Sequence, residues 1–452
     1  MSDLAIIILA AGKGTRMHSF QPKVLHGLAG RPWILHLIET AKLLNPDGIY
    51  MVVSPNNRAP IELAVSGQNC RFIEQKETLG TAHAVLQALP QIKADHTLIL
   101  LGDTPLLTGD TLAQLLRHTP VKGVGMLSFE PENPSGLGRV LRDASGNIVG
   151  VKEEKDASHT EKAIREAAVG VYYAPTSVLC TLLPQINNQN ASQEYYLPDI
   201  IPLALQAKHP IVALKIHEAM QGFGINTKNQ LAIAERYLQR KQIEELMGQG
   251  LTVIDPHRVD IRGKLTVKQD VVLDIDVIIE GDVIIGQGCT IGAHTILRNV
   301  HLGDFVTVNP YSMIEDSHIE NHCVIGPYAR IRPGCHLHER AHVGNFVELK
   351  KTQLGADSKA NHLSYVGDAI VGERVNIGAG TITCNYDGVH KHQTVIKDGA
   401  FIGSNSALVA PVCVGEHAVI GAGTVLTKDA PAKQLTVARS KQVSIEHWNK
   451  DK

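Results

Sequence analysis

The chain has 452 residues, of which 44% are hydrophobic and 19% charged, the composition of a soluble globular protein. Its formal net charge of −2 and its lack of like-charge runs exclude a surface built to bind nucleic acid or a membrane. Seven scattered cysteines without a C-x-x-C pair exclude a disulfide framework and a zinc cage, and they favour a cytoplasmic location.

The first apolar run, Leu4 to Ala11, has no basic leader and opens directly into a glycine-rich loop. We therefore expect a buried strand there and not a signal peptide. No stretch of the sequence is long and apolar enough to span a bilayer.

Strand-like and helix-like stretches alternate over roughly the first half of the chain, which predicts an α/β domain with a mostly parallel sheet. The stretches are 5–11, 32–44, 49–54, 81–89, 97–102 and 111–118. Thr227 and Gln230 then have the spacing of a capping box, and Gly248 and Gly250 are helix stop signals. The predicted organisation is a first domain over 1–228, a linker helix over 229–250, a second domain over 251–437 and a tail over 438–452.

A glycine-rich loop follows the first predicted strand and reads Gly12-Lys13-Gly14-Thr15-Arg16. Glycines let backbone N–H groups approach phosphate oxygens, and the two cations would neutralise their charge. The spacing fits neither the Walker A loop nor the dinucleotide-binding fingerprint. Taken alone, the loop is equally compatible with a tight structural turn.

Further along the first domain, several residues extend the case for a phosphate site. Lys23 adds a third cation, and Gln75, Gly80 and Thr81 surround a turn before a predicted helix. Asp103 follows a buried strand, at the sheet edge where α/β proteins bind ligands. Asp103 is therefore a candidate Mg²⁺ ligand, although a turn residue remains the alternative.

The second half of the chain carries aliphatic residues every six positions. This period predicts a solenoid of short parallel strands, three to a coil, and it lacks the two-residue alternation of a β-sandwich. The repeating positions are Ile261, Val267, Leu273, Ile279, Ile285, Ile291 and Leu297; Leu302, Val308 and Ile314; Ile319, Ile325, Ile331, Leu337, Val343 and Leu349; and Ile402, Leu408, Val414, Ile420 and Leu426.

The repeat is interrupted between Ile377 and Ile396, so we expect residues 378–388 to leave the coil and to form part of a binding site. A second feature is the sequence His338-Glu339-Arg340-Ala341-His342, a formal H-E-x-x-H match. That zinc motif requires a helix, whereas the six-residue register predicts strands here. We therefore do not assign zinc to it.

The motifs L-A-A-G-K-G-T-R-M, P-K, L-G-T-A and G-D-T-P-L resemble those of the sugar-1-phosphate nucleotidyltransferases. Joined to a hexapeptide β-helix, they are similar over nearly the whole chain to bacterial enzymes that acetylate glucosamine-1-phosphate and uridylylate the product. The resemblance implies a Rossmann-like first domain and a left-handed parallel β-helix. It also implies acetyl-CoA and UTP as co-substrates, Mg²⁺ as cofactor, and a homotrimer built through the β-helix. The product would supply peptidoglycan and lipopolysaccharide precursors.

The resemblance also implies roles for individual residues. UTP and the UDP-sugar would contact Leu9, Ala11, Gly12, Arg16, Lys23, Gln75, Gly80, Thr81, Gly138, Glu153, Ala168 and Asn226, with Arg16 and Lys23 acting in catalysis and Asp103 and Asn226 holding Mg²⁺. Glucosamine-1-phosphate would contact Arg332, Lys350, Tyr365, Asn376 and Asn385, with His362 as general base. Acetyl-CoA would contact Ala379, Asn385, Tyr386, Lys391, Ser404, Ala422 and Arg439.

One position departs from the family pattern E-[IV]-N-T-G, because Ala168 stands where the family has asparagine. The absence of the asparagine side chain predicts a weaker Michaelis constant or a less selective choice of sugar, but not an inactive site. Two alternatives to the bifunctional enzyme remain open. One is another hexose-1-phosphate nucleotidyltransferase whose β-helix only oligomerises or regulates, and the other is a silent scaffold with the same two domains.

Overall fold

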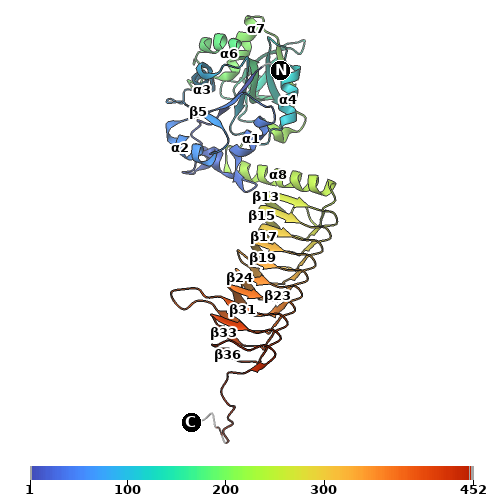
Figure 1. Ribbon diagram of the computed structural model, residues 1–452. Helices are drawn as coiled ribbons and strands as arrows, with labels where there is room; N and C mark the ends of the chain where they lie inside the picture. Colours follow the sequence, from blue (N-terminus) through green and yellow to red (C-terminus); the bar gives the residue numbers. More distant parts are fainter. Residues whose placement is uncertain (1–2, 447, 449–452) are drawn as a thin grey trace. The chain divides into compact units, whose positions relative to one another are not determined.

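The computed structural model describes residues 3–446 and 448. The chain divides into two compact units, Met1–Leu238 and Gln239–Lys452 (Figure 1). The final residues of the predicted tail, 447 and 449–452, lie outside the described part. Within that part, no helix has the length and apolar character needed to cross a membrane.

A mixed, mostly parallel sheet forms the centre of the first unit, in the order β11-β7-β10-β6-β1-β4-β5. β1 pairs in parallel with β4 and β6, whereas β10 runs antiparallel to β6 and β7. The strands are β1 (Leu4–Leu9), β4 (Gly48–Val53), β5 (Cys70–Glu74), β6 (His96–Leu101), β7 (Val124–Phe129), β8 (Arg139–Arg142), β9 (Ile148–Lys152), β10 (Ala167–Pro175) and β11 (Ile211–Lys215), with a small hairpin of β2 (Gly27–Leu28) and β3 (Arg31–Pro32).

Helices cover both faces of this sheet (Figure 1). Because strand side chains alternate between faces, Ile6 and Ile8 pack with Leu37 of α1 on one side, whereas Ile7 packs with Val85 of α3 on the other. The helices are α1 (Trp33–Lys42), α2 (Pro55–Ala64), α3 (Thr81–Ala88), α4 (Gly109–His118), α5 (His159–Lys162), α6 (Thr176–Leu182), α7 (Ile200–Gln206) and α8 (Lys228–Gly248). Short 3₁₀ turns occur at Thr15–Met17, Lys23–Leu25, Leu89–Gln91, Leu183–Gln185, Leu197–Asp199 and Ala219–Gly222.

The second unit is a coil of short parallel strands stacked one above the other (Figure 1). Its strands are β12 (Thr252–Val253), β13 (Val259–Val267), β14 (Val272–Leu273), β15 (Val277–Ile285), β16 (Thr290–Ile291), β17 (Ile296–Leu302), β18 (Thr307–Val308), β19 (Met313–Ile319), β20 (Val324–Ile325), β21 (Arg330–Ile331), β22 (His336–Leu337), β23 (His342–Asn345), β24 (Glu348–Lys350), β25 (Gln353–Leu354), β26 (Lys359–His362), β27 (Tyr365–Gly367), β28 (Ala369–Val371), β29 (Asn376–Ile377), β30 (Ile382–Cys384), β31 (Thr394–Ile396), β32 (Phe401–Ile402), β33 (Ala407–Val409), β34 (Val412–Val414), β35 (Val419–Ile420), β36 (Val425–Leu426) and β37 (Leu435–Thr436).

The predicted six-residue register is confirmed by the core of this coil. The repeating aliphatic residues form one continuous buried cluster, against which Val267 is only partly buried. Ile261 pairs with Ile279 one coil later, and Leu302 pairs with Ile319. Each side chain therefore stacks on its equivalent in the next coil.

One expectation about the coil is wrong in part. Residues 378–388 do not all leave it, because β30 pairs with β27 below and β33 above. Thr383, six residues after Ile377, occupies a core position of the coil and is 1% exposed. Its hydroxyl donates to the carbonyl of Gly367 at 3.0 Å and accepts from the N–H of Gly367 at 2.7 Å. A polar residue thus keeps the six-residue spacing of the coil. The chain leaves the coil only at Asn385, after β30 ends.

The long helix α8 begins with the predicted capping box. The N–H of Gln230 donates to Oγ1 of Thr227 at 3.2 Å, and the N–H of Thr227 donates to Oε1 of Gln230 at 3.1 Å. Further along α8, Gln239 exchanges two hydrogen bonds with the backbone of Ile261, at 2.6 and 2.8 Å. Ile243 is buried in the core of the second unit. This part of α8 therefore covers the first coil.

Candidate functional site

The predicted phosphate-binding residues of the first unit line one cavity of about 500 Å³ at the carboxyl ends of β1 and β6. The lining includes Leu9, Ala11, Gly12, Arg16, Lys23, Gln75, Gly80, Thr81, Asp103 and Asn226. It also includes Lys13, which the sequence motif contained, and Glu194, which no sequence pattern singled out.

Two glycines let the chain close tightly around this cavity. Gly14 has a φ of 61°, and a Cβ there would lie 2.8 Å from Cβ of Lys23. Gly80 has a φ of 118°, and a Cβ there would lie 2.5 Å from the carbonyl oxygen of Tyr195. An L side chain would be strained at both positions, so glycine is required by backbone conformation as well as by space.

Buried Gln75 holds the turn around Gly80 in place. Its Nε2 donates to the carbonyl of Gly80 at 3.1 Å and lies 3.0 Å from Nδ1 of His83. Oγ1 of Thr81 accepts from the N–H of Leu197 at 3.0 Å. The predicted polar residues thus shape the wall of the cavity through contacts with the backbone.

The centre of the cavity is an ionic cluster. Nζ of Lys23 donates to Oδ2 of Asp103 and to Oδ1 of Asn226, each at 2.7 Å. Arg16 also donates to Oδ1 of Asn226, at 2.8 Å. Two hard oxygens from distant parts of the chain therefore converge on one cation, and such a donor set fits Mg²⁺.

The predicted sugar-binding residues lie together beside β8 and β9. The N–H of Ala168 donates to the carbonyl of Gly138 at 2.8 Å. A Cβ on Gly138 would lie 3.3 Å from Oε1 of Glu153, so a side chain at position 138 would crowd this carboxylate. Burial raises the pKa of Glu153, and the nearby carboxylates, Asp199 foremost, raise it further.

A second polar group lies on the coil, where β24, β27 and β30 stack. Nδ2 of Asn385 donates to the hydroxyl of Tyr365 at 3.4 Å and also to Asp368. Lys350 Nζ lies 3.7 Å from Oδ2 of the same Asp368. The structure thus brings together three predicted residues around a carboxylate that the sequence did not single out.

Two further cations belong to the same region. Contact with Lys350 and its positive charge lower the pKa of Lys391, which places these two ammonium groups close together. Arg332 donates to Oε1 of Glu348 at 2.8 Å, and Glu348 pairs with Tyr365 one coil later. Neighbouring cations of this kind suit a phosphate group.

His362 lies at the end of β26, in a different sheet from β24 and β27. Its Nδ1 lies 2.6 Å from Oδ1 of Asn345, one coil earlier. An amide oxygen only accepts, so this contact requires the proton on Nδ1, and in the neutral imidazole Nε2 is then the nitrogen with a free lone pair. Asn376 lies in the next strand of that sheet, where it follows Lys359 in register. Asn345 is recognisable in sequence only once the one-coil spacing is known.

The residues expected to contact acetyl-CoA fall into two groups. Ala379 accepts from the N–H of Asn405, and Ser404 accepts from the N–H of Gly423, so these positions stack in successive coils. Arg439 donates to the carbonyl of Ala422 and continues the stack.

The second group lies on the projecting loop between β30 and β31, visible in orange in Figure 1. Tyr386 pairs with Lys391 there in an antiparallel bridge. Tyr386 is 58% exposed and Val389, at the tip, is 76% exposed. The loop is therefore a short hairpin that presents an aromatic side chain to solvent.

Family models match both units of the chain. The MobA-like NTP transferase domain matches residues 6–147. The bacterial transferase hexapeptide model matches residues 316–351 and 393–428, and the hexapeptide repeat of succinyl-transferase matches residues 282–309. The second unit is thus a left-handed parallel β-helix of hexapeptide repeats.

Curated relatives match along nearly the full length of the chain. The chain is 48% identical over 446 residues to Bifunctional protein GlmU of Ralstonia nicotianae, with 98% of both chains covered. It is 46% identical over 450 residues to Bifunctional protein GlmU of Methylobacillus flagellatus, with 99% of this chain and 97% of the relative covered. It is 46% identical over 448 residues to the protein of the same name from Idiomarina loihiensis, with 99% and 98% covered.

Proposed function

The chain belongs to the GlmU family of bifunctional proteins, and from this we infer that it is an enzyme with uridyltransferase and acetyltransferase activity. The first reaction transfers the acetyl group of acetyl-CoA to the amine of glucosamine-1-phosphate. The second transfers uridylyl from UTP to the resulting N-acetylglucosamine-1-phosphate and releases pyrophosphate. The product, UDP-N-acetylglucosamine, is a precursor of the cell wall. The observation that carries this conclusion is the identity of 48% over 98% of the chain.

We assign uridylyl transfer to residues 1–228, where the cavity at β1 and β6 lies. A phosphate oxygen of the sugar attacks the α-phosphorus in line, and the oxygen that bridges to the β-phosphorus leaves with pyrophosphate. Arg16 and Lys23 would neutralise the charge that develops on the transferring group, because both cations line the cavity. Catalysis is then positioning and electrostatic stabilisation, without a protein nucleophile.

Asp103 and Asn226 would hold Mg²⁺ in this cavity. Their two oxygens already converge on Nζ of Lys23, which supports the assignment. A metal ion in place of the ammonium group would leave Lys23 free to contact phosphate. When bound, the metal supplies positive charge next to the phosphate oxygens.

Sugar recognition in the same domain is assigned to Gly138, Glu153 and Ala168. The Glu153 carboxylate, next to Gly138, can accept a hydrogen bond from a sugar hydroxyl. Ala168 can offer its backbone but no side-chain amide.

Acetyl transfer is assigned to the β-helix, residues 251–437. His362 would take the proton from the sugar amine through Nε2, since Asn345 holds the proton on Nδ1. Arg332, Lys350, Tyr365 and Asn385 would bind the sugar phosphate, with Asn376 in the sheet that carries His362. The thioester carbon accepts the amine, and the CoA thiolate leaves. The assigned acetyl-CoA contacts are Ala379, Asn385, Tyr386, Lys391, Ser404, Ala422 and Arg439.

A homotrimer through the β-helix is proposed as the working state. His362 and Lys350 belong to different sheets of the β-helix, so a site that uses both roles can be completed by residues of two copies. The hairpin also exposes Tyr386 and Val389, which could pack against a second copy. An exposed aromatic side chain on such a hairpin would be stabilised by packing against a second copy. A cytoplasmic location is proposed with it, which fits the seven free thiols.

The experiment is mass spectrometry of products after the purified protein receives glucosamine-1-phosphate, acetyl-CoA, UTP and Mg²⁺. UDP-N-acetylglucosamine is the expected product. His362→Ala should yield no acetylated sugar but should still uridylylate supplied N-acetylglucosamine-1-phosphate, and Asp103→Asn should accumulate that intermediate. Absence of acetylated sugar and of free CoA from the unaltered enzyme would contradict the proposal and favour a nucleotidyltransferase with a structural β-helix.

A further inference from the structure

A column of histidines, none of them assigned to either reaction, runs along the β-helix. The register pairs His301 with His318 and His318 with His336, so each imidazole lies one coil above the last. The ring centroids of His301 and His318 are 4.6 Å apart, and those of His318 and His336 are 4.9 Å apart. Stacking of coils alone therefore concentrates imidazole nitrogens in one place.

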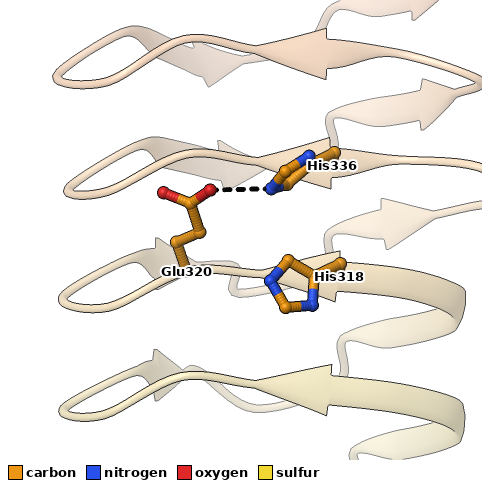
Figure 2. Close-up of side chains that lie close together, drawn as sticks. All are labelled: His318, Glu320 and His336. Carbon is orange, nitrogen blue, oxygen red and sulfur yellow. Dashed lines mark hydrogen bonds and ion pairs between the residues drawn. The ribbon is translucent and has the colours of Figure 1, made fainter.

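A carboxylate lies beside this column. Oε1 of Glu320 lies 2.8 Å from Nε2 of His336 and 3.1 Å from Nδ1 of His338. Oε2 of Glu320 accepts from the N–H of Glu339 at 3.1 Å, which orients the group. Figure 2 shows His318 and Glu320 on one coil, with Glu320 bonded to His336 on the next coil.

We propose that His318, Glu320 and His336 form a binding site for a divalent transition metal of the zinc class. One ligand atom from each of the three lies within 4.8 Å of the others. Two imidazole nitrogens and one carboxylate oxygen are a ligand set that zinc accepts, with water in the fourth position. Because His318 and Glu320 belong to one coil and His336 to the next, the metal would clamp two coils together.

The spacing of the three groups is compatible with direct ligation. Zinc lies about 2.0–2.2 Å from such ligands, and tetrahedral geometry then spaces the ligand atoms by roughly 3.4 Å. The side chains of Glu320 and His336 are 34% and 37% exposed, so small rotations about their side-chain bonds can reach that spacing. His318 and Glu320 line an open groove of about 350 Å³, together with Lys268, His301 and Asp304, through which water and metal can enter.

This site is not the H-E-x-x-H motif. That motif would use His338 and His342, but His338 follows β22, whereas His342 begins β23 in the other large sheet. His342 pairs with Lys359 one coil later and does not belong to the histidine column. The ligands proposed here are one coil apart, a spacing that no local sequence motif records.

The test uses full-length, metal-free protein titrated with Zn²⁺ by calorimetry, with Co²⁺ absorption as a probe of coordination. Unaltered protein should bind one more tight equivalent than H318N, E320Q or H336N. Each substitution should weaken that equivalent by more than the 10–100-fold expected from loss of an outer-shell partner. Zn²⁺ should also raise the melting temperature of the unaltered protein more than that of the variants, since binding to the folded state stabilises it.

H342N is the matched control, because it removes a histidine of the zinc-protease motif and leaves the proposed ligands intact. It should bind and respond to Zn²⁺ as the unaltered protein does. Equal stoichiometry and affinity in E320Q and the unaltered protein would overturn the proposal, as would loss of the site in H342N. Melting temperatures without metal separate loss of ligation from loss of folding, because E320Q keeps the volume of the side chain.

Discussion

Ala168 is the residue at which the uridyltransferase site differs from its family pattern. Its backbone N–H donates to the carbonyl of Gly138, and its methyl side chain offers no further hydrogen bond. One hydrogen bond to a neutral ligand contributes about 1 kcal/mol, or roughly a fivefold change in affinity.

We therefore expect Ala168→Asn to lower the KM for N-acetylglucosamine-1-phosphate about fivefold. Steady-state uridylyl transfer at varied sugar phosphate measures this effect. Acetyl transfer by the same variant is the internal control and should not change. An unchanged or higher KM would mean that the alanine costs nothing in binding.

Glu153 combines a proposed binding role with a cost in stability. Its pKa is raised by burial and by neighbouring carboxylates, so the folded protein holds a proton that the unfolded chain has released. Between the usual glutamate pKa and the raised value, the free energy of unfolding must therefore fall as pH rises.

Glu153→Gln should remove this pH dependence. We expect the variant to melt at a higher temperature than the unaltered protein at pH 7, with the gain disappearing at pH below the usual glutamate pKa. Its KM for the sugar phosphate should rise, because the amide is a weaker acceptor. Thermal unfolding across pH checks the first outcome, and a gain that persisted in acid would refute the explanation by ionisation.

At the scale of elements, the strand β30 shows how a polar residue can serve a hydrophobic coil. Thr383 satisfies both backbone groups of Gly367 from inside the core. Removal of its hydroxyl leaves two buried polar groups without a partner, and each costs about 1–3 kcal/mol. The hairpin that follows β30 is therefore anchored by these hydrogen bonds in the core.

Thr383→Val should destabilise the β-helix by about 2 kcal/mol or more, although valine matches threonine in shape. Thr383→Ser keeps the hydroxyl and should retain most of the stability. Denaturant unfolding followed in the β-helix measures both. If valine proved as stable as threonine, the two hydrogen bonds would have no net value in the coil.

At the scale of the whole molecule, α8 serves the cores of both units. Ala234 belongs to a buried cluster of the first unit, and Ile243 belongs to the core of the β-helix. Gln239 closes the first coil through its two bonds to Ile261. A truncation before α8 and a truncation after it should therefore affect the stability of the two units differently.

Two fragments should keep separate activities. Residues 1–248 should uridylylate N-acetylglucosamine-1-phosphate, and residues 228–452 should acetylate glucosamine-1-phosphate. A β-helix fragment that starts at residue 251 should melt at a lower temperature than the one that starts at 228, because it lacks Gln239 and Ile243. Equal melting temperatures would show that the helix does not contribute to the first coil.

The β-helix could be predicted from the sequence, because a six-residue period of aliphatic side chains fits no other regular structure. It also indicated the mostly parallel α/β sheet and the capping box at Thr227, since each depends on spacing within a short stretch. The motif residues around Gly12 and Asp103 were recognisable for the same reason. Local chemistry along the chain carries that information.

The contacts between side chains of different coils and strands could not be predicted, and they became known from the three-dimensional structure. Three examples are Asn345 beside His362, Asp368 beside Lys350, and Thr383 in the core. Each depends on which residues lie one coil apart, and the number of residues in a coil changes along the chain. The group of His318, Glu320 and His336 is the same case, whereas the contiguous His338–His342 motif does not converge. A contact between residues one coil apart depends on the conformation of every residue between them. Local sequence patterns predict the individual strands and turns but not the position that their combination gives to a side chain.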